Sequence, residues 1–217
     1  MLIRILALGM FETNCYLLAA DEGDAAAVVD PVDDAPFIKS SAEKLNLNIT
    51  HILLTHGHFD HILALKELKD LTQATVCIHS GDAEMLKSEE NCLASFVGAD
   101  YQPCEPDVLL EDGQQIKIGA LTVQALHTPG HTPGGLTFHV PALKPSEKSV
   151  AFTGDALFRG AIGRTDLAGG DEEQLLRGIR EKIFTLPEDT ILFPGHGPDT
   201  TVGFEKKNNP FFNKSIR

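Results

Sequence analysis

The 217-residue sequence has no tryptophan, few aromatic residues (6%) and far fewer basic than acidic side chains. Its 18 Lys and Arg residues against 31 Asp and Glu residues give a formal net charge of −13. Proteins that bind nucleic acid usually present a basic stripe to the phosphates, so this balance argues against a nucleic-acid partner. The acidic charge is more simply explained as a means of staying soluble.

Paired cysteines and long apolar runs are also missing. The four cysteines show no C-x-x-C pair, which indicates reduced thiols and a cytoplasmic location. No apolar stretch reaches the roughly 18 residues that a membrane span needs, so no membrane partner is expected. The N-terminal run 2–8 carries Arg4 and lacks a small-residue cleavage site, which predicts a β-strand and not a signal peptide.

The length fits one domain, residues 1–217, with a substantial core. Amphipathic segments predict helices at about 34–45, from about Asp60 onward, and between Asp171 and Pro187. The pattern predicts an α+β fold in which sheets pack on each other with helices outside. Strand-like runs lie at 2–8, 14–20, 25–30, 49–55, 76–78, 116–118, 121–125, 136–140, 149–153 and 190–193.

Four apolar runs each end in a residue of the kind that binds metals. HILLTH ends at His56, VQALHTPGH at His131, SVAFTGD at Asp155 and TILFPGH at His196. Glycines beside these residues allow the backbone to turn sharply. We therefore expect each run to deliver its last polar side chain to one rim of the fold, where the four together form a site.

The segment HGHFDH holds four metal-binding side chains within six positions. His56 and His58 are two residues apart in a loop and can bind one ion, while Asp60 and His61 can turn toward a second. Two divalent ions about 3.5–4 Å apart can activate water and polarise a substrate. Imidazole suits zinc, iron or manganese, and a carboxylate such as Asp155 can bridge two ions. We expect two divalent ions, with zinc as the first choice and iron or manganese as alternatives.

The remaining histidines are expected to lie outside the ligand set. His51 and His79 are interpreted as structural. His127 is expected to hydrogen-bond to the backbone and brace the loop that carries His131. His139 alternates with an apolar neighbour in a strand and is expected to be exposed.

These motifs resemble the metallo-β-lactamase superfamily over nearly the whole chain. The resemblance implies a four-layer αββα sandwich of two mixed β-sheets. It also implies a binuclear centre, with Asp60 and Asp155 as the catalytic carboxylates. In the implied assignment, His56, His58 and His131 hold metal one, Asp60, His61 and His196 hold metal two, and Asp155 bridges them.

Within the superfamily, the segments FTGDALFRGAIGRTD and IFTLP resemble compact glyoxalase II enzymes and the related persulfide dioxygenases. The first resemblance implies that a metal-bridging hydroxide cleaves a small, anionic acyl thioester such as S-lactoylglutathione. Arg159 and Arg164 are candidates to attract its carboxylate, and Phe158 is a candidate apolar wall. Alternatively, one arginine pairs with Asp166. Only 21 residues (197–217) follow His196, so the C-terminal glutathione-binding domain of full-length glyoxalase II is missing or replaced.

The sequence is compatible with several other functions. A persulfide dioxygenase would use a single iron on His56, His58 or a similar partial set. A lactonase or other ester hydrolase is a further alternative, as is a non-catalytic metal-binding protein. Antibiotic-destroying lactamases use the position of Asp155 differently, which disfavours that activity. The chain is expected to be a monomer or a homodimer, and Phe211 and Phe212 are expected to dock on the domain or on a partner.

Overall fold

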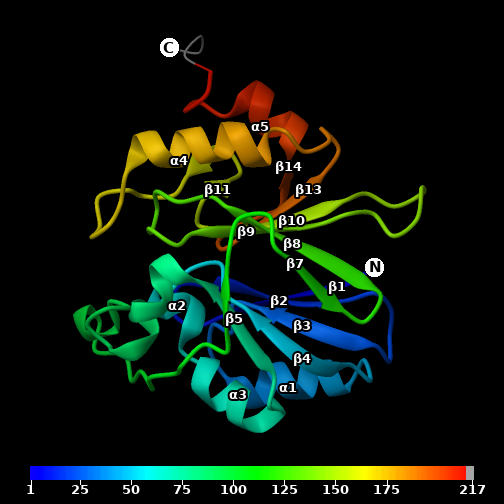
Figure 1. Ribbon diagram of the computed structural model, residues 1–217, viewed down its shortest axis with the longest axis vertical. Coiled ribbons are helices and arrows are strands. Elements are labelled where there is room, and N and C mark those ends of the chain that lie inside the picture. The colour runs from blue at the N-terminus through cyan, green and yellow to red at the C-terminus, as the bar shows by residue number, and fades with distance from the viewer. Residues whose placement is uncertain (214–217) are drawn as a thin grey trace.

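Two six-stranded sheets lie face to face in the computed structural model, which describes residues 1–213 (Figure 1). The first sheet has the strand order β1-β2-β3-β4-β5-β6: β1 (Leu2–Leu8), β2 (Thr13–Ala19), β3 (Ala25–Val29), β4 (Asn48–Leu53), β5 (Thr75–His79) and β6 (Val108–Leu110). The second has the order β14-β13-β10-β9-β8-β7: β14 (Thr200–Thr201), β13 (Ile191–Pro194), β10 (Val150–Gly154), β9 (Leu136–Val140), β8 (Leu121–His127) and β7 (Gln115–Ile118). A short ribbon pairs β11 (Leu157–Phe158) with β12 (Ala161–Ile162).

Both sheets are mixed. In the first, β1 to β3 pair antiparallel and β3 to β6 pair parallel. Parallel neighbours need a crossover connection, and α1 (Ala35–Glu43) supplies it between β3 and β4. In the second, β13 runs parallel to β10 and the other neighbours are antiparallel.

Helices cover the outer face of each sheet. Helices α1 and α3 (Leu65–Thr72) lie below the first sheet in Figure 1, whereas α4 (Glu172–Gly178) and α5 (Val202–Asn208) lie above the second. The short helix α2 (Phe59–Ile62) and the 3-10 turns η1 (Ser80–Lys87) and η2 (Ala94–Phe96) lie at one end. The order of layers is therefore helix, sheet, sheet, helix, and the predicted αββα fold is confirmed.

Apolar side chains fill three layers of core. Phe138 lies between the two sheets, Ile38 lies beneath the helices of the first sheet, and Leu175 belongs to the core beneath α4. Strand β2 is buried along all seven residues because its alternate side chains enter two different layers. Leu17 belongs to the helix-side layer and Leu18 to the layer between the sheets.

Two predicted helices are interrupted. The helix expected from about Asp60 begins at Phe59 but divides into α2 and α3, because the Ala64 N–H donates to the carbonyl of Pro31, outside the helix (3.1 Å). The helix expected between Asp171 and Pro187 begins as α4 and continues as a π-helix, η3 (Ile179–Ile183). The wider turn is closed by the Phe184 N–H donating to the Ile179 carbonyl (2.8 Å).

The expectation that His139 is exposed is wrong. Both of its ring nitrogens are buried and have no hydrogen-bond partner. Its cross-strand neighbour Ala151 belongs to the core beneath α4 and η3, so this face of β9 is covered. Burial lowers the pKa of His139 below its ordinary value.

Among residues 1–213, no helix is long and apolar enough to cross a membrane.

Candidate metal centre

Four loops bring the predicted ligands to one edge of the sandwich. They follow β4, β8, β10 and β13, and they carry His56, His131, Asp155 and His196 respectively. The last three strands run in the same direction within the second sheet, so their carboxyl ends share an edge. The loop after β4 meets them from the first sheet, and in this way residues far apart in the sequence become neighbours.

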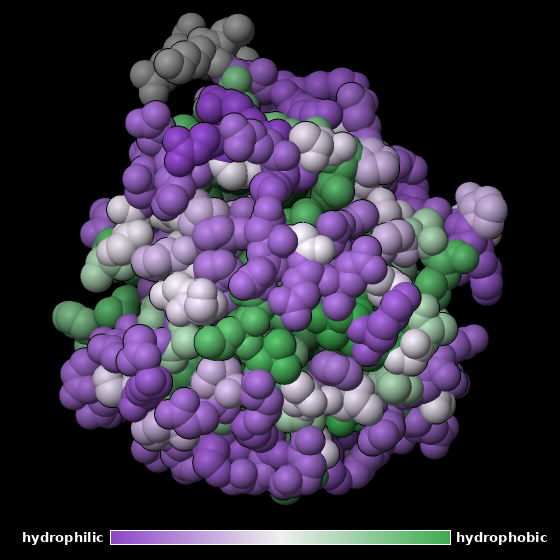
Figure 2. Space-filling view, in the orientation of Figure 1, coloured by the Kyte–Doolittle hydropathy of each residue, from purple (hydrophilic) through white to green (hydrophobic). Residues whose placement is uncertain are grey.

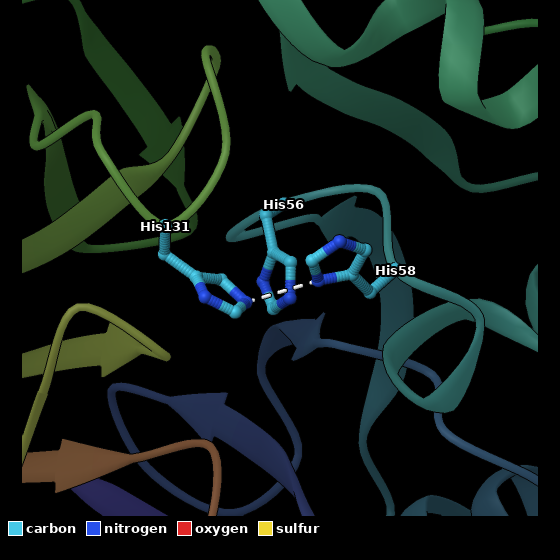
Figure 3. Close-up of side chains that lie close together, drawn as sticks. All are labelled: His56, His58 and His131. Atoms are coloured by element: carbon cyan, nitrogen blue, oxygen red, sulfur yellow. Dashed lines mark hydrogen bonds between the residues drawn. The ribbon is translucent and has the colours of Figure 1, made fainter. Parts of the chain in front are cut away.

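Three histidines form the first cluster. One ring nitrogen from each of His56, His58 and His131 lies within 4.8 Å of the other two. His58 Nδ1 and His131 Nε2 are 2.9 Å apart, and Figure 3 shows the three rings converging from two loops. Each ring is steeply inclined to the others, at 79° to 89°. The nitrogens thus point into a shared space instead of stacking.

Asp155 lies between this cluster and a second one formed by Asp60, His61 and His196. Its Oδ1 is 3.3 Å from His61 Nε2, while its Oδ2 is 3.6 Å from His131 Nε2 and 3.7 Å from His196 Nε2. Asp60 Oδ2 is 3.3 Å from His196 Nε2 and 3.8 Å from His61 Nε2. The structure therefore brings all seven predicted ligand residues together.

Several polar atoms at this centre are buried without a partner. His56 Nε2, His61 Nε2 and Asp155 Oδ1 make no hydrogen bond. A buried polar atom left unpaired costs about 1–3 kcal/mol, so native proteins rarely leave three together. Imidazole nitrogens and carboxylate oxygens are the donors that zinc and iron accept. The residues present thus fit divalent cations.

A hydrogen-bond chain through Asp30 fixes the orientation of two of the rings. Asp30 accepts from the Thr55 hydroxyl (2.6 Å) and from His61 Nδ1 (2.9 Å). Since the Thr55 proton is directed at Asp30, the Thr55 oxygen accepts from His56 Nδ1 (3.1 Å). Both histidines then carry a proton on Nδ1, which leaves Nε2 as the ring nitrogen that can bind a metal ion at the centre. Neither Asp30 nor Thr55 was predicted from the sequence to support the centre, although the apolar strand-ending pattern AAAVVD was a signal for Asp30.

The loops themselves are held by backbone contacts and by a second buried carboxylate. His131 Nδ1 donates to the carbonyl of Arg164 (2.8 Å), which leaves its Nε2 free to face the centre. Asp82, fully buried, accepts from Thr132 Oγ1 (2.7 Å) and from the N–H groups of Gly134 (2.6 Å) and Gly57 (3.2 Å). It ties together the loops that carry His58 and His131, a role with no local signal in the sequence.

Burial and mutual repulsion set the charges at the centre. Burial and the nearby His131 lower the pKa of His58 to about 3, and burial also lowers the pKa of His56. Burial opposes a charge on His61 as well, but Asp155 and Asp60 outweigh it and raise the pKa of His61. Burial alone would raise the pKa of Asp60 and of Asp155; in each, His61 and the other imidazoles hold it below its ordinary value. Both carboxylates therefore stay ionised, as ligands must be.

Of the three predicted substrate-binding residues, Arg164 lines the cavity beside the metal centre, whereas Arg159 and Phe158 do not. Arg164 lines a cavity beside the centre but forms a double hydrogen bond with Asp166 (2.7 and 2.8 Å), the bracing alternative. Arg159 does not line this cavity and packs over the Phe204 ring. Phe158 is not in its wall either, although its ring centroid is 6.2 Å from that of His196.

The other histidines and the C-terminal phenylalanines are also placed. His127 Nε2 donates to the Pro133 carbonyl (3.0 Å), which confirms that it braces the loop of His131. Its ring stacks on His79, outside the ligand clusters. Phe212 docks on the domain against Phe184, whereas Phe211 is 43% exposed.

A family model described as the metallo-beta-lactamase superfamily matches residues 8–196. The chain belongs to this superfamily. One of its relatives, named hydroxyacylglutathione hydrolase GloC, from Haemophilus influenzae, is 39% identical over 213 residues, which cover 97% of this chain and 98% of that protein. Its membership of this superfamily groups the chain with the metallo-hydrolases.

Two solved structures resemble this superfamily member closely. The structure titled BLEG-1 B3 metallo-beta-lactamase matches with a TM-score of 0.90 and 37% identity, covering 98% of this chain and 100% of that one. TTHA1623 in a di-iron-bound form matches with a TM-score of 0.82 and 34% identity, covering 96% and 99%.

Proposed function

We propose that this hydrolase binds two divalent ions, zinc by preference, and uses them to cleave small acyl thioesters. The observation that carries the proposal is the convergence of buried, unpartnered nitrogen and carboxylate atoms at one edge of the sandwich. His56, His58 and His131 would hold one ion, Asp60, His61 and His196 would hold the other, and Asp155, which lies between the two sets, would serve both.

The number and placement of donors support two ions. A structural zinc ion takes four ligands, so seven donor residues exceed what one such ion uses. The two oxygens of Asp155 also lie near different histidines: Oδ1 is close to His61, and Oδ2 is close to His131 and His196. The di-iron form of the similar TTHA1623 supports two ions and keeps iron open as the native metal.

When bound, two such ions lower the pKa of a water molecule to about 7 and polarise a carbonyl group. The protein's own residues prepare the place where this happens. Asp60 and Asp155 line the cavity and stay ionised, so their charge faces an entering substrate. Asp30, through Thr55 and His61, keeps the imidazole lone pairs directed inward. Thioester chemistry is supported by the relative named hydroxyacylglutathione hydrolase.

The test is metal analysis followed by hydrolysis. Protein purified without added metal is expected to contain about two zinc, iron or manganese ions per chain by elemental analysis. The loaded protein is expected to release free thiol from S-lactoylglutathione or from uncharged thioesters, and a chelator is expected to abolish the release. If metal-free protein is reloaded with zinc, iron or manganese and still cleaves no thioester, the thioesterase proposal is wrong.

A second candidate is oxidation of a persulfide by molecular oxygen at a single iron. It is favoured by the first cluster, because His56, His58 and His131 form a complete three-nitrogen site by themselves. One iron per chain, together with oxygen uptake on a persulfide and no thiol release from thioesters, would establish this alternative. Because of the BLEG-1 match, a β-lactam belongs in the same assay. Oligomeric state and cytoplasmic location stay predictions.

A further inference from the structure

A cavity of about 610 Å³ opens beside the candidate metal centre. Five of the proposed ligand residues line it: His58, Asp60, His131, Asp155 and His196. Such a volume is typical of sites that bind a small organic molecule. The remaining lining is mostly apolar and comes from four separate parts of the chain: Phe11, Phe59, Leu93, Phe96, Val97 and Leu167.

Several of these apolar side chains face solvent. Phe96 is 81% exposed, Phe11 48% and Val97 44%. Single exposed apolar residues are ordinary, but a group of them around one cavity marks a binding site. Phe11 contacts Phe59 edge to face, with ring centroids 5.7 Å apart, which gives that wall a defined shape. In Figure 2 apolar surface reaches the edge of the molecule beside the loops between β5 and β6.

Apart from the metal centre, the described lining of the cavity provides little positive charge to bind an anionic substrate. Within the described residues, Arg164 is the one Lys or Arg side chain that lines it, and both oxygens of Asp166 already neutralise its guanidinium. Asp166 itself lies in the wall, and Arg159 packs on Phe204 elsewhere. A glutathione moiety carries two carboxylates, and among residues 1–213 no unpaired Lys or Arg side chain lines this wall to bind them.

We propose that this cavity selects thioesters whose bulk is apolar and uncharged, and that Phe96 is a specificity-determining residue. The inference rests on the proposed thioesterase activity and names its substrate class. It replaces the expectation of an anionic substrate drawn by Arg159 and Arg164. The apolar part of the substrate lies against Phe11, Phe59 and Phe96, while its carbonyl reaches the centre at Asp60 and Asp155.

The first experiment measures kcat/KM of the metal-loaded protein on four matched thioesters. Lactoyl and phenylacetyl groups are each joined to glutathione and to the uncharged thiol N-acetylcysteamine. The phenylacetyl thioester of N-acetylcysteamine is expected to be the best substrate, at least tenfold above S-lactoylglutathione. A preference of the same size for S-lactoylglutathione would overturn the proposal.

The second experiment uses binding, which does not depend on turnover. In thioether analogues a methylene group separates the carbonyl from the sulfur, so that they bind without being cleaved. The uncharged phenylacetyl analogue is expected to bind at least tenfold more tightly than the lactoyl-glutathione analogue, by titration calorimetry. Phe96→Ala is expected to reduce this ratio about tenfold. The matched control Phe37→Ala removes a phenylalanine that is 41% exposed on α1, outside the cavity, and leaves the ratio unchanged.

The two experiments separate the two proposals. If no thioester is cleaved but the apolar analogue binds best and Phe96→Ala weakens it, the cavity is as proposed and the thioesterase function is wrong. If thioesters are cleaved but the glutathione analogue binds best, or Phe96→Ala and Phe37→Ala behave alike, the cavity inference is wrong. Because Phe96 is highly exposed, its replacement does not threaten folding.

Discussion

The metal centre and the His79–His127 pair both bring imidazole rings close together, but with opposite geometry. At the centre the rings of His58 and His131 are 4.7 Å apart and inclined at 81°. In the pair the rings are 3.9 Å apart and nearly parallel, at 12°. A ring nitrogen directs its lone pair in the plane of the ring, so stacked rings cannot aim at one point between them. Closeness of histidines is therefore a weaker signal of a metal site than their mutual inclination.

The hydrogen-bond partners differ in the same way. At the centre, the outward nitrogens of His56, His61 and His131 are occupied by protein groups. The inward Nε2 atoms of His56 and His61 have no hydrogen-bond partner, and His131 Nε2 contacts only another ligand residue, His58. In the pair, His79 Nδ1 accepts from the Gly81 N–H (3.0 Å), which places its proton on Nε2. No carboxylate joins the pair in a ligand cluster among the described residues. A metal site thus needs partners behind the ligands as much as the ligands themselves.

The largest expected loss of metal and of activity comes from removing Asp155, the carboxylate that lies between the two ligand clusters. Asp155→Ala is expected to reduce the metal content from about two ions per chain to about one. Thioester hydrolysis is expected to fall by more than about 100-fold, because both ions lose a ligand. Elemental analysis and a thiol-release assay measure the two effects. Two tightly held ions in the variant would show that Asp155 does not bridge.

A smaller loss is expected behind the ligands. Asp30→Asn removes the acceptor that fixes the His56 and His61 tautomers, so metal affinity is expected to fall about 10–100-fold. Competition with a chelator of known affinity measures it. Asp112→Asn is the matched control beside the stacked pair, where Asp112 accepts from the His127 N–H (2.9 Å). Equal losses in both variants would contradict the proposed role of Asp30.

The next effect concerns stability and pH. Burial lowers the pKa of His139, so the unfolded chain takes up a proton near pH 6.5 that the folded chain does not bind at this residue. Its contribution therefore destabilises the fold progressively as the pH falls below about 6.5. His139→Leu is expected to stabilise the fold by about 1 kcal/mol at neutral pH and by more at pH 5. Urea unfolding at both pH values measures the difference, and an equal change at both would contradict the explanation.

The smallest effect is expected at the stacked pair. His79→Ala is expected to leave metal content at about two ions and thioester hydrolysis within about twofold, since this ring holds no ion. Its loss of stability is expected to be about 1 kcal/mol, from one hydrogen bond and one ring contact. Loss of a metal ion in this variant would show that the comparison between the two regions is wrong.

Local patterns revealed the elements and the ligands unevenly. Strand-ending motifs predicted the ligands His56, His131, Asp155 and His196. Such a motif, an apolar run followed by a turn and a polar residue, is contained in one short stretch of sequence. The break at Ala64 was missed because it depends on the Pro31 carbonyl, which comes from another part of the chain. The buried face of His139 was missed for the same reason, since a covering helix decides it.

The sequence by itself determined the packing of sheets with helices outside, the strand ends and the identity of the candidate ligands, because periodicity and short spacing express these features locally. The four-layer αββα order followed from the resemblance to the superfamily. The tertiary structure alone decided that Asp30 and Asp82 support the centre, since their partners lie at least 25 residues away. It also decided that Phe11, Phe59 and Phe96 share one cavity. Contacts between distant segments form only when the sheets pack, and no local pattern records them.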